Sequence, residues 1–145
     1  MKALLQRVSS SKVEVEGKVV GQINKGLLVF IGIEKQDDTI CADKMINKIL
    51  SYRVFSDSND KMNLSIRDIN GDLLIVSQFT LAAETKSGTR AGFSTAMPPI
   101  EAENLYNYFL EKTKSMTTIT ESGIFGANMK VSLVNDGPVT FLLET

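Results

Sequence analysis

The chain has 145 residues, of which 43% are hydrophobic and 23% are charged, and its formal net charge is −1. This length and composition are typical of one folded domain with one hydrophobic core. The sequence has no histidine, no tryptophan and a single cysteine, Cys41. The lack of histidine excludes Ser-His-Asp and Cys-His nucleophile systems, and with only one cysteine the usual zinc sites and an intrachain disulfide are excluded as well.

The sequence contains no pattern of a signal peptide and no uninterrupted apolar run of about 18 residues. We therefore expect a cytoplasmic protein that has no membrane span, and nothing in the sequence indicates a cofactor or a metal site. Because 16 basic residues stand against 17 acidic ones, a broad basic surface for nucleic acid is not expected. A small local phosphate site remains compatible with this charge.

The first third of the chain is rich in strand patterns. Residues 3–8 form a mixed apolar run, and residues 13–16 alternate between apolar and acidic side chains. The order predicts a hairpin that turns at Glu16-Gly17-Lys18. Residues 27–33 are apolar on both faces, which predicts a buried central strand.

Two helices are predicted further along the chain. Asp37-Asp38-Thr39 offers N-cap oxygens, and the apolar residues that follow recur at near-helical spacing, so we expect a helix from about Thr39 to Tyr52. Pro98-Pro99 suits the first turn of a second helix, whose apolar face continues to about Lys112.

The remaining segments read as strands and loops. Val54-Phe55 predicts a short strand, and Leu73–Leu81 predicts a second central strand. Residues 82–97 are small and polar and predict an ordered, irregular loop. Residues 117–120 predict a further strand. Apolar and polar side chains alternate over residues 129–133, which predicts a half-buried strand there.

A turn sequence, Asn135-Asp136-Gly137-Pro138, is expected to break the strand before a final strand at Val139–Leu143. No internal repeat or linker is present. Many strands and two main helices predict one α/β domain over residues 1–145, with a mostly antiparallel, barrel-like sheet.

Polar residues follow the second central strand. Ser77-Gln78-Phe79-Thr80 lies where side chains and backbone donors could face a cleft, although an ordinary strand end has the same composition. Ser77 or Thr80 could act as a nucleophile. A hydroxyl is a poor nucleophile without a nearby base, and here neither a histidine nor the amine of an N-terminal threonine can serve.

Three other features have an ordinary and a functional interpretation. The loop Gly88–Gly92, with Arg90 inside it, is either a surface loop or a set of donors for a phosphate. The sequence Asn135–Pro138 is explained by a simple turn, whose X–Pro bond would by default be trans. Arg7 either points to solvent or satisfies its donors with carbonyls or a carboxylate in a cleft.

Two motifs resemble a known family. Ser77-Gln78-Phe79-Thr80-Leu81 and Asn135-Asp136-Gly137-Pro138-Val139-Thr140 are similar to the signature motifs of the D-aminoacyl-tRNA deacylases. The resemblance covers nearly the whole chain and extends to residues 6–8, 52–57, 61–64 and 125–133. The sequence departs from the family at Arg90-Ala91-Gly92-Phe93, where the pattern is Arg-Pro-x-Phe.

The resemblance implies a homodimeric enzyme that hydrolyses the ester between a D-amino acid and the 3′-terminal ribose of tRNA, with some action on glycyl-tRNA. It implies that Gly137-Pro138 has a cis peptide bond and enters the active site of the partner subunit, where it excludes an L side chain. Arg7 would hold that turn, Ser77–Thr80 would line the pocket with backbone groups, and Met129 would contact the substrate.

A mechanism follows as a hypothesis. Backbone N–H groups near Phe79 and Thr80 would stabilise the oxyanion, and the ribose 2′-hydroxyl would assist the attacking water. The competing mechanism makes Thr80 a covalent nucleophile. We expect contact with the acceptor end alone, by stacking of the terminal base and a few phosphate contacts. Two rival interpretations are a non-catalytic RNA-binding module and a small oligomeric hydrolase of a reactive metabolite.

Overall fold

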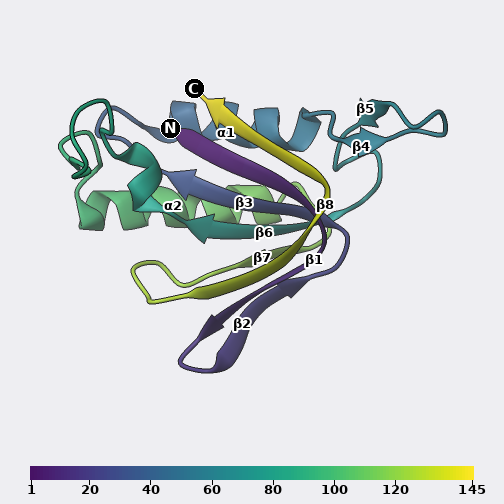
Figure 1. Cartoon of the computed structure of the whole chain (residues 1–145), viewed down its shortest axis with the longest axis horizontal. Helices are drawn as coiled ribbons and strands as arrows, with labels where there is room; N and C mark the ends of the chain where they lie inside the picture. The colour runs from purple at the N-terminus through teal and green to yellow at the C-terminus, as the bar shows by residue number, and fades with distance from the viewer.

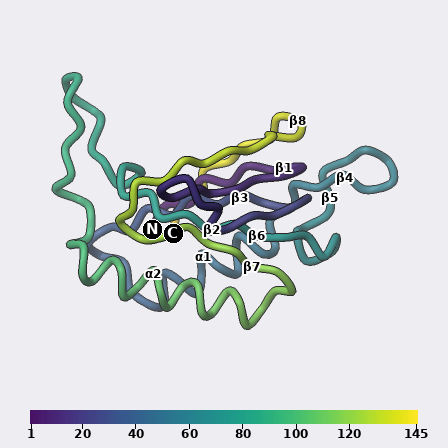
Figure 2. Tube along the Cα trace, turned by 90° about the horizontal axis from the view of Figure 1, so that it is seen from below, coloured from purple at the N-terminus to yellow at the C-terminus, as the bar shows by residue number.

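Two helices cover one face of a curved mixed sheet in the computed structural model, which describes residues 1–145 (Figures 1 and 2). The helices are α1 (Thr39–Ser51), α2 (Pro99–Lys114) and the short 3-10 helix η1 (Phe79–Ala82). The strands are β1 (Lys2–Val15), β2 (Lys18–Ile23), β3 (Gly26–Gly32), β4 (Phe55–Ser56), β5 (Met62–Leu64), β6 (Asp72–Ser77), β7 (Thr120–Ser122) and β8 (Lys130–Glu144).

The main sheet has the order β2-β1-β3-β6-β7, and β8 pairs with β1. β1 is antiparallel to β2, β3 and β8, whereas β3, β6 and β7 are parallel to one another. Because β2 also contacts β7, the sheet curls into a nearly closed, barrel-like form. This confirms the predicted fold class, a mostly antiparallel barrel-like sheet with two main helices.

The larger hydrophobic core lies between the helices and the sheet. Met45 and Ile49 of α1, Tyr106 and Phe109 of α2, and Leu27 of β3 all belong to this one buried cluster. Successive strand residues point to opposite faces, so the neighbouring residues of β3 face the inside of the curl and join a smaller cluster there. β3 is therefore apolar on both faces, as its sequence predicted.

The predicted helices are confirmed, with ends within two residues of the expected ones. The side chain of Asp38 accepts a hydrogen bond from the Cys41 N–H at 2.8 Å and so caps α1. Pro99 occupies the first turn of α2, where its missing N–H leaves no hydrogen bond unmade. The hairpin between β1 and β2 also forms at Glu16-Gly17, both of which have positive φ.

Four of the predicted strands differ in the structure from their expected limits or pairing. The strand expected at Leu73–Leu81 ends at Ser77, because the chain turns into η1 instead of continuing. The strand expected at residues 117–120 lies at Thr120–Ser122. The short strand expected at Val54-Phe55 is β4, but its partner β5 was not predicted. The final strand is not broken at residues 135–138, since β8 runs from Lys130 to Glu144.

The turn sequence forms a bulge inside β8. Between the pairs Gln6–Thr140 and Val8–Asn135, β1 has one residue, Arg7, whereas β8 has the four residues 136–139. The surplus chain forms a small hook at the bend of β1 and β8, beside the β8 label in Figure 2. The Gly137-Pro138 bond is cis, so the trans bond that the turn pattern alone suggests is wrong and the family resemblance indicated the correct isomer.

Candidate active site

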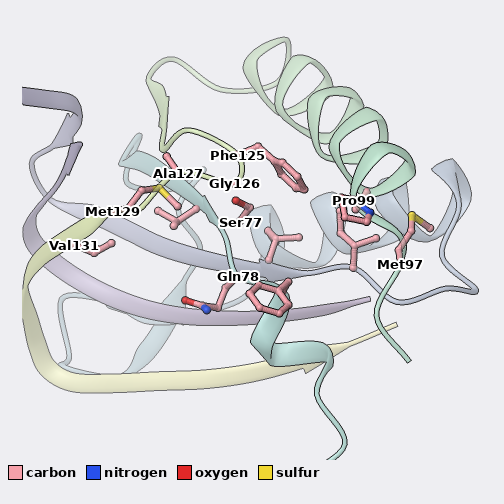
Figure 3. Close-up of a pocket in the computed structure, with 14 residues that line it drawn as sticks. Ser77, Gln78, Met97, Pro99, Phe125, Gly126, Ala127, Met129 and Val131 are labelled. Atoms are coloured by element: carbon pink, nitrogen blue, oxygen red, sulfur yellow. The ribbon is translucent and has the colours of Figure 1, made fainter. Parts of the chain in front are cut away.

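A pocket of about 460 Å³ lies at the C-terminal end of β6, between the sheet and the start of α2. In Figure 3, Met129 and Val131 form one end, Met97 and Pro99 form the other, and Ser77 lies between them. The fourteen lining residues are Ile31, Ile33, Val76, Ser77, Gln78, Phe79, Met97, Pro99, Ala102, Phe125, Gly126, Ala127, Met129 and Val131.

The floor of the pocket is fixed by the way β6 ends. Ser77 pairs with Ile31 of β3, and the Gln78 N–H donates to the Ile31 carbonyl at 2.7 Å. The chain then winds into η1, which packs against Gly32. A Cβ at Gly32 would lie 2.7 Å from the Leu81 Cβ, so only glycine lets η1 lie this close to β3. The end of β6 and the start of η1 are held in one place by these contacts.

Backbone donors are free at the start of η1. The Leu81 N–H donates to the Gln78 carbonyl at 3.1 Å, whereas the N–H groups of Phe79 and Thr80 have no partner within the chain. This is expected, because the first N–H groups of a helix have no carbonyl one turn earlier to bind. The pocket edge therefore offers two unpaired backbone donors.

The Thr80 hydroxyl is engaged by a neighbouring amide and not by a base. Gln78 Nε2 donates to Thr80 Oγ1 at 2.5 Å, and Thr80 itself is exposed beside the pocket and does not line it. None of the fourteen lining residues has a side chain that ionises near neutral pH. No side chain that lines the pocket can therefore act as a general base toward Thr80 or a water molecule near neutral pH.

A buried tyrosine supports the pocket from behind. The Tyr106 hydroxyl of α2 donates to the Ile75 carbonyl of β6 at 2.9 Å, and its ring lies 5.7 Å from the ring of Phe125. Burial raises the pKa of Tyr106 well above its ordinary value, so the hydroxyl remains protonated and continues to donate. This contact ties α2, β6 and the Phe125 wall together.

The second signature motif lies elsewhere. Arg7 Nε donates to the Asp136 carbonyl at 2.9 Å, and Arg7 Nη1 donates to the Val54 carbonyl at 2.7 Å. Of the two interpretations of Arg7, the structure therefore has the one in which carbonyls take its donors. Asn135 supports the other side of the bulge. Its Nδ2 donates to Thr140 Oγ1 at 3.0 Å, and its Oδ1 accepts from the Val139 N–H at 3.1 Å.

The tip of the bulge is exposed and tightly shaped. Asp136, Gly137 and Pro138 are all exposed. Gly137 has a φ of +132°, and a Cβ there would lie 2.8 Å from Arg7 Nη2 and 2.8 Å from Val139 Cγ2. An L side chain at this position would both strain the backbone and displace its supports.

The structure divides the predicted site residues into two groups. Ser77, Gln78, Phe79 and Met129 line the pocket, and Thr80 follows directly. Arg7, Gly137 and Pro138 lie at the bend of β1 and β8 and contribute nothing to the pocket. In the sheet register Arg7 is level with Leu27 and Leu73, near the start of β6, whereas Ser77 is at its end.

Several pocket residues were missed from the sequence. Met97, Pro99 and Ala102 are ordinary residues of a loop and a helix start, and only the packing of α2 on the sheet brings them to the pocket. Phe125, Gly126 and Ala127 belong to the segment that entered only as part of the resemblance. No local pattern marks these residues.

The loop considered for phosphate binding stands away from the body of the protein. The segment between η1 and α2 projects from the sheet in Figure 2, and a pair of backbone hydrogen bonds between Glu84 and Gly92, of 2.8 and 3.0 Å, closes its tip. Arg90 is exposed within that tip. Phe93 then returns to the pocket mouth, where its ring lies 5.0 Å from the ring of Phe79.

The structure shows neither a membrane-spanning helix nor a cluster of metal ligands. No helix has the length and apolar character needed to cross a bilayer. The structure also has no group of three or more His, Cys, Asp or Glu side chains placed to hold a metal ion.

Comparison with known proteins gives full-length matches. The family described as D-Tyr-tRNA(Tyr) deacylase matches residues 4–144. The chain is 58% identical to the D-aminoacyl-tRNA deacylase of Pseudomonas fluorescens (strain Pf0-1) over 100% of both chains, and 56% identical to that of Vibrio cholerae over 99% of both.

Solved structures have the same fold. The structure named c-Myc DNA Unwinding Element Binding Protein superposes with a TM-score of 0.96 at 40% identity, over 100% of this chain and 99% of that one. A probable eukaryotic D-amino acid tRNA deacylase superposes with a TM-score of 0.87 at 16% identity, over 98% and 97% of the two chains, and so shows the shared fold. With residues 4–144 matched and relatives above 55% identity along its whole length, this chain belongs to the D-Tyr-tRNA(Tyr) deacylase family.

Proposed function

We propose that this protein hydrolyses the ester of D-aminoacyl-tRNA and releases the free D-amino acid and tRNA. The observation that carries the proposal is the full-length family match combined with a pocket whose floor is the Ser77-Gln78-Phe79 segment. An apolar pocket with a few convergent polar groups is the usual form of a small-molecule site. Here it would hold the terminal adenosine and its amino acid.

The chemistry proposed for the pocket uses backbone groups. The free N–H groups of Phe79 and Thr80 would bind the ester carbonyl as it becomes an oxyanion. The aminoacyl ester is already reactive, and the neighbouring ribose hydroxyl would assist the attacking water. This division of labour fits a pocket that has no ionisable side chain to act as a base.

The surroundings of Thr80 support this mechanism over covalent catalysis. Its hydroxyl oxygen accepts a hydrogen bond from Gln78 Nε2, and no basic group lies in the pocket to take its proton. A nucleophilic hydroxyl needs such a base. We therefore propose that Thr80 acts through its backbone, with the side chain holding Gln78.

The exclusion of L-amino acids is proposed to come from a second copy of the chain. The Gly137-Pro138 tip is exposed, and it lies near the other end of the strands from the pocket of its own chain. In a homodimer the tip of one copy would enter the pocket of the other, where its carbonyls would clash with an L side chain. The same tip would also orient the D-aminoacyl ester for attack by water. Arg7 and Asn135 would keep the tip in position.

Rejection by a clash has a consequence for glycine. Glycine has no side chain for the tip to exclude, so glycyl-tRNA is expected to be hydrolysed as well. The exclusion of L-amino acids by this steric filter, the Gly137-Pro138 tip, should also not depend on which amino acid the tRNA carries, because the clash begins at the Cβ atom.

The proposal is tested by measuring deacylation of D-tyrosyl-, L-tyrosyl- and glycyl-tRNA side by side. We expect hydrolysis of the D-tyrosyl and glycyl esters and protection of the L-tyrosyl ester. An Ala127→Phe variant, which fills the pocket, serves as the inactive control. Binding of all three without release of amino acid would instead favour a non-catalytic RNA-binding module, and equal cleavage of both tyrosyl esters would contradict the steric filter.

A further inference from the structure

An exposed pair of aromatic rings stands at the mouth of the pocket. Phe79 is 61% exposed and Phe93 is 43% exposed, although large apolar side chains are usually buried. Their ring centroids are 5.0 Å apart with a tilt of 42°, so the two rings form one continuous apolar surface. Phe79 also lines the pocket, which makes this surface, the Phe79–Phe93 platform, a continuation of the pocket wall.

The platform is held in place from both sides. Phe79 begins η1, which is fixed on β3. Phe93 lies two residues before Thr95, whose hydroxyl donates to the Ala82 carbonyl at the end of η1 and whose carbonyl accepts from the Lys35 N–H at 2.9 Å. The segment that carries Phe93 is therefore attached to the helix that carries Phe79.

The size of the pocket determines what must cover the platform. A volume of about 460 Å³ suits one drug-sized ligand. If the terminal adenosine and its amino acid occupy it, the rest of the single strand must leave through the mouth, and the next base then lies over the rim. Unpaired bases bind proteins chiefly by stacking on aromatic side chains.

The charges near the platform suit an RNA strand. The projecting loop has two exposed basic residues, Lys86 and Arg90, in a chain whose net charge is −1. Its one acidic side chain, Glu84, accepts a hydrogen bond from the Lys86 N–H at 3.2 Å. Phosphates that follow the stacked base would pass beside a locally positive loop.

We propose that the Phe79–Phe93 platform stacks the base of the penultimate nucleotide of the tRNA acceptor end. This inference rests on the proposed function and adds a binding site outside the pocket. It also assigns a role to the loop whose Arg90-Ala91-Gly92-Phe93 sequence lacks the proline of the family pattern: the loop supplies Phe93 to the mouth.

The test uses three D-tyrosyl esters that differ only beyond the terminal adenosine: D-tyrosyl-adenosine, D-tyrosyl-CpA, and D-tyrosyl-CpA without the cytosine base. For the wild type, we expect kcat/KM to be about 5- to 150-fold higher on the dinucleotide than on the other two esters, the range typical of one stacked base. Phe93→Ala should remove most of that ratio, and Phe93→Tyr should keep it. Ile119→Ala is the matched control, because Ile119 is also 43% exposed but lies beside β7.

Several results would overturn the platform. One is an unchanged ratio in Phe93→Ala. Another is an equal loss of kcat/KM on all three esters in Phe93→Ala, together with weaker dimerisation of that variant. This result would mean that a second copy of the chain covers Phe93. If the wild type cleaves none of the esters, its activity on D-tyrosyl-tRNA decides whether the proposed function fails. In that event, equal binding of a CCA trinucleotide to the wild type and to Phe93→Ala would overturn the platform as well, whereas weaker binding by the variant would support it.

Discussion

The pocket at the end of β6 and the bulge at the bend of β1 and β8 are built in opposite ways. The pocket is a concave apolar site, and its polar groups are mostly backbone atoms released where a strand changes into η1. The bulge is a convex tip of exposed residues, and side chains, Arg7 and Asn135, hold its backbone from below. In our proposal, main-chain atoms are the groups that face the substrate in both regions.

The difference shows why the two signature motifs are far apart in one chain. A convex tip cannot restrict a concave pocket that lies near the other end of the same strands. In our proposal they meet only when two copies pair, so that selectivity and catalysis belong to the dimer. Both depend on main-chain geometry, which side-chain substitutions alter only indirectly.

The largest effect is expected from removing a backbone donor in the pocket. Phe79→Pro deletes the N–H of residue 79, at the first position of a helix where proline is otherwise well tolerated. Loss of one oxyanion donor should lower kcat by about 10²–10³-fold. Single-turnover deacylation of D-tyrosyl-tRNA measures this.

The control for this variant is Phe79→Ala, which keeps the N–H and removes the ring. Comparison of the two separates the donor from the stacking platform. Equal kcat values for the alanine and proline variants would remove the N–H of Phe79 from the mechanism.

A smaller effect is expected from loosening the bulge. Arg7→Met removes the hydrogen bonds to the Asp136 and Val54 carbonyls while keeping a long side chain. Hydrogen bonds to charged groups contribute about 1.5–3 kcal/mol, so the ratio of D-tyrosyl to L-tyrosyl cleavage should fall by roughly 10- to 100-fold. Lys12→Met, at another cation of β1 that pairs only with Glu14, should leave the ratio unchanged.

The pH dependence should reflect the substrate and not the pocket. No lining side chain ionises near neutral pH, and Tyr106 stays protonated because burial raises its pKa. The enzymatic rate divided by the rate of spontaneous hydrolysis of the same ester should therefore change by less than about tenfold between pH 6 and 8. A bell-shaped ratio would reveal an enzyme base that the pocket geometry does not contain.

The smallest effect is expected at the Thr80 hydroxyl. Thr80→Ala removes only the acceptor for Gln78 Nε2 and keeps the backbone donor, so kcat should stay within roughly tenfold of the wild type. Removal of the nucleophile of a catalytic triad would instead lower kcat by about 10⁶-fold. Trapping of an acyl-enzyme on the wild type, or complete loss of turnover in the variant, would support the covalent mechanism instead.

Local patterns predicted the regular elements well. The Asp38 cap, Pro99 and the doubly apolar β3 each act through neighbours close in the sequence, so their signals are readable without tertiary structure. The motif residues Ser77, Gln78 and Phe79 were also recognised, although only the family resemblance distinguished them from an ordinary strand end.

The remaining features depend on contacts distant in the sequence. β6 stops at Ser77 because η1 packs on Gly32, some 45 residues earlier along the chain, and such contacts leave no periodic signal. The bulge at residues 136–139 depends on Arg7, from the opposite end of the chain. Pocket residues such as Met97 and Ala102 become neighbours of Phe125 only through the packing of α2.

The most direct test of the account is complementation between two inactive variants. Ala127→Phe fills the pocket and keeps the bulge, whereas Gly137→Ala displaces the bulge and keeps the pocket. Each should lose about 10²-fold or more of its activity alone, since small displacements of positioning groups have effects of that size. After chain exchange, verified with differently tagged copies, the mixture should cleave D-tyrosyl-tRNA well above the sum of the two variants. Activity no greater than that sum would contradict a site shared between two copies.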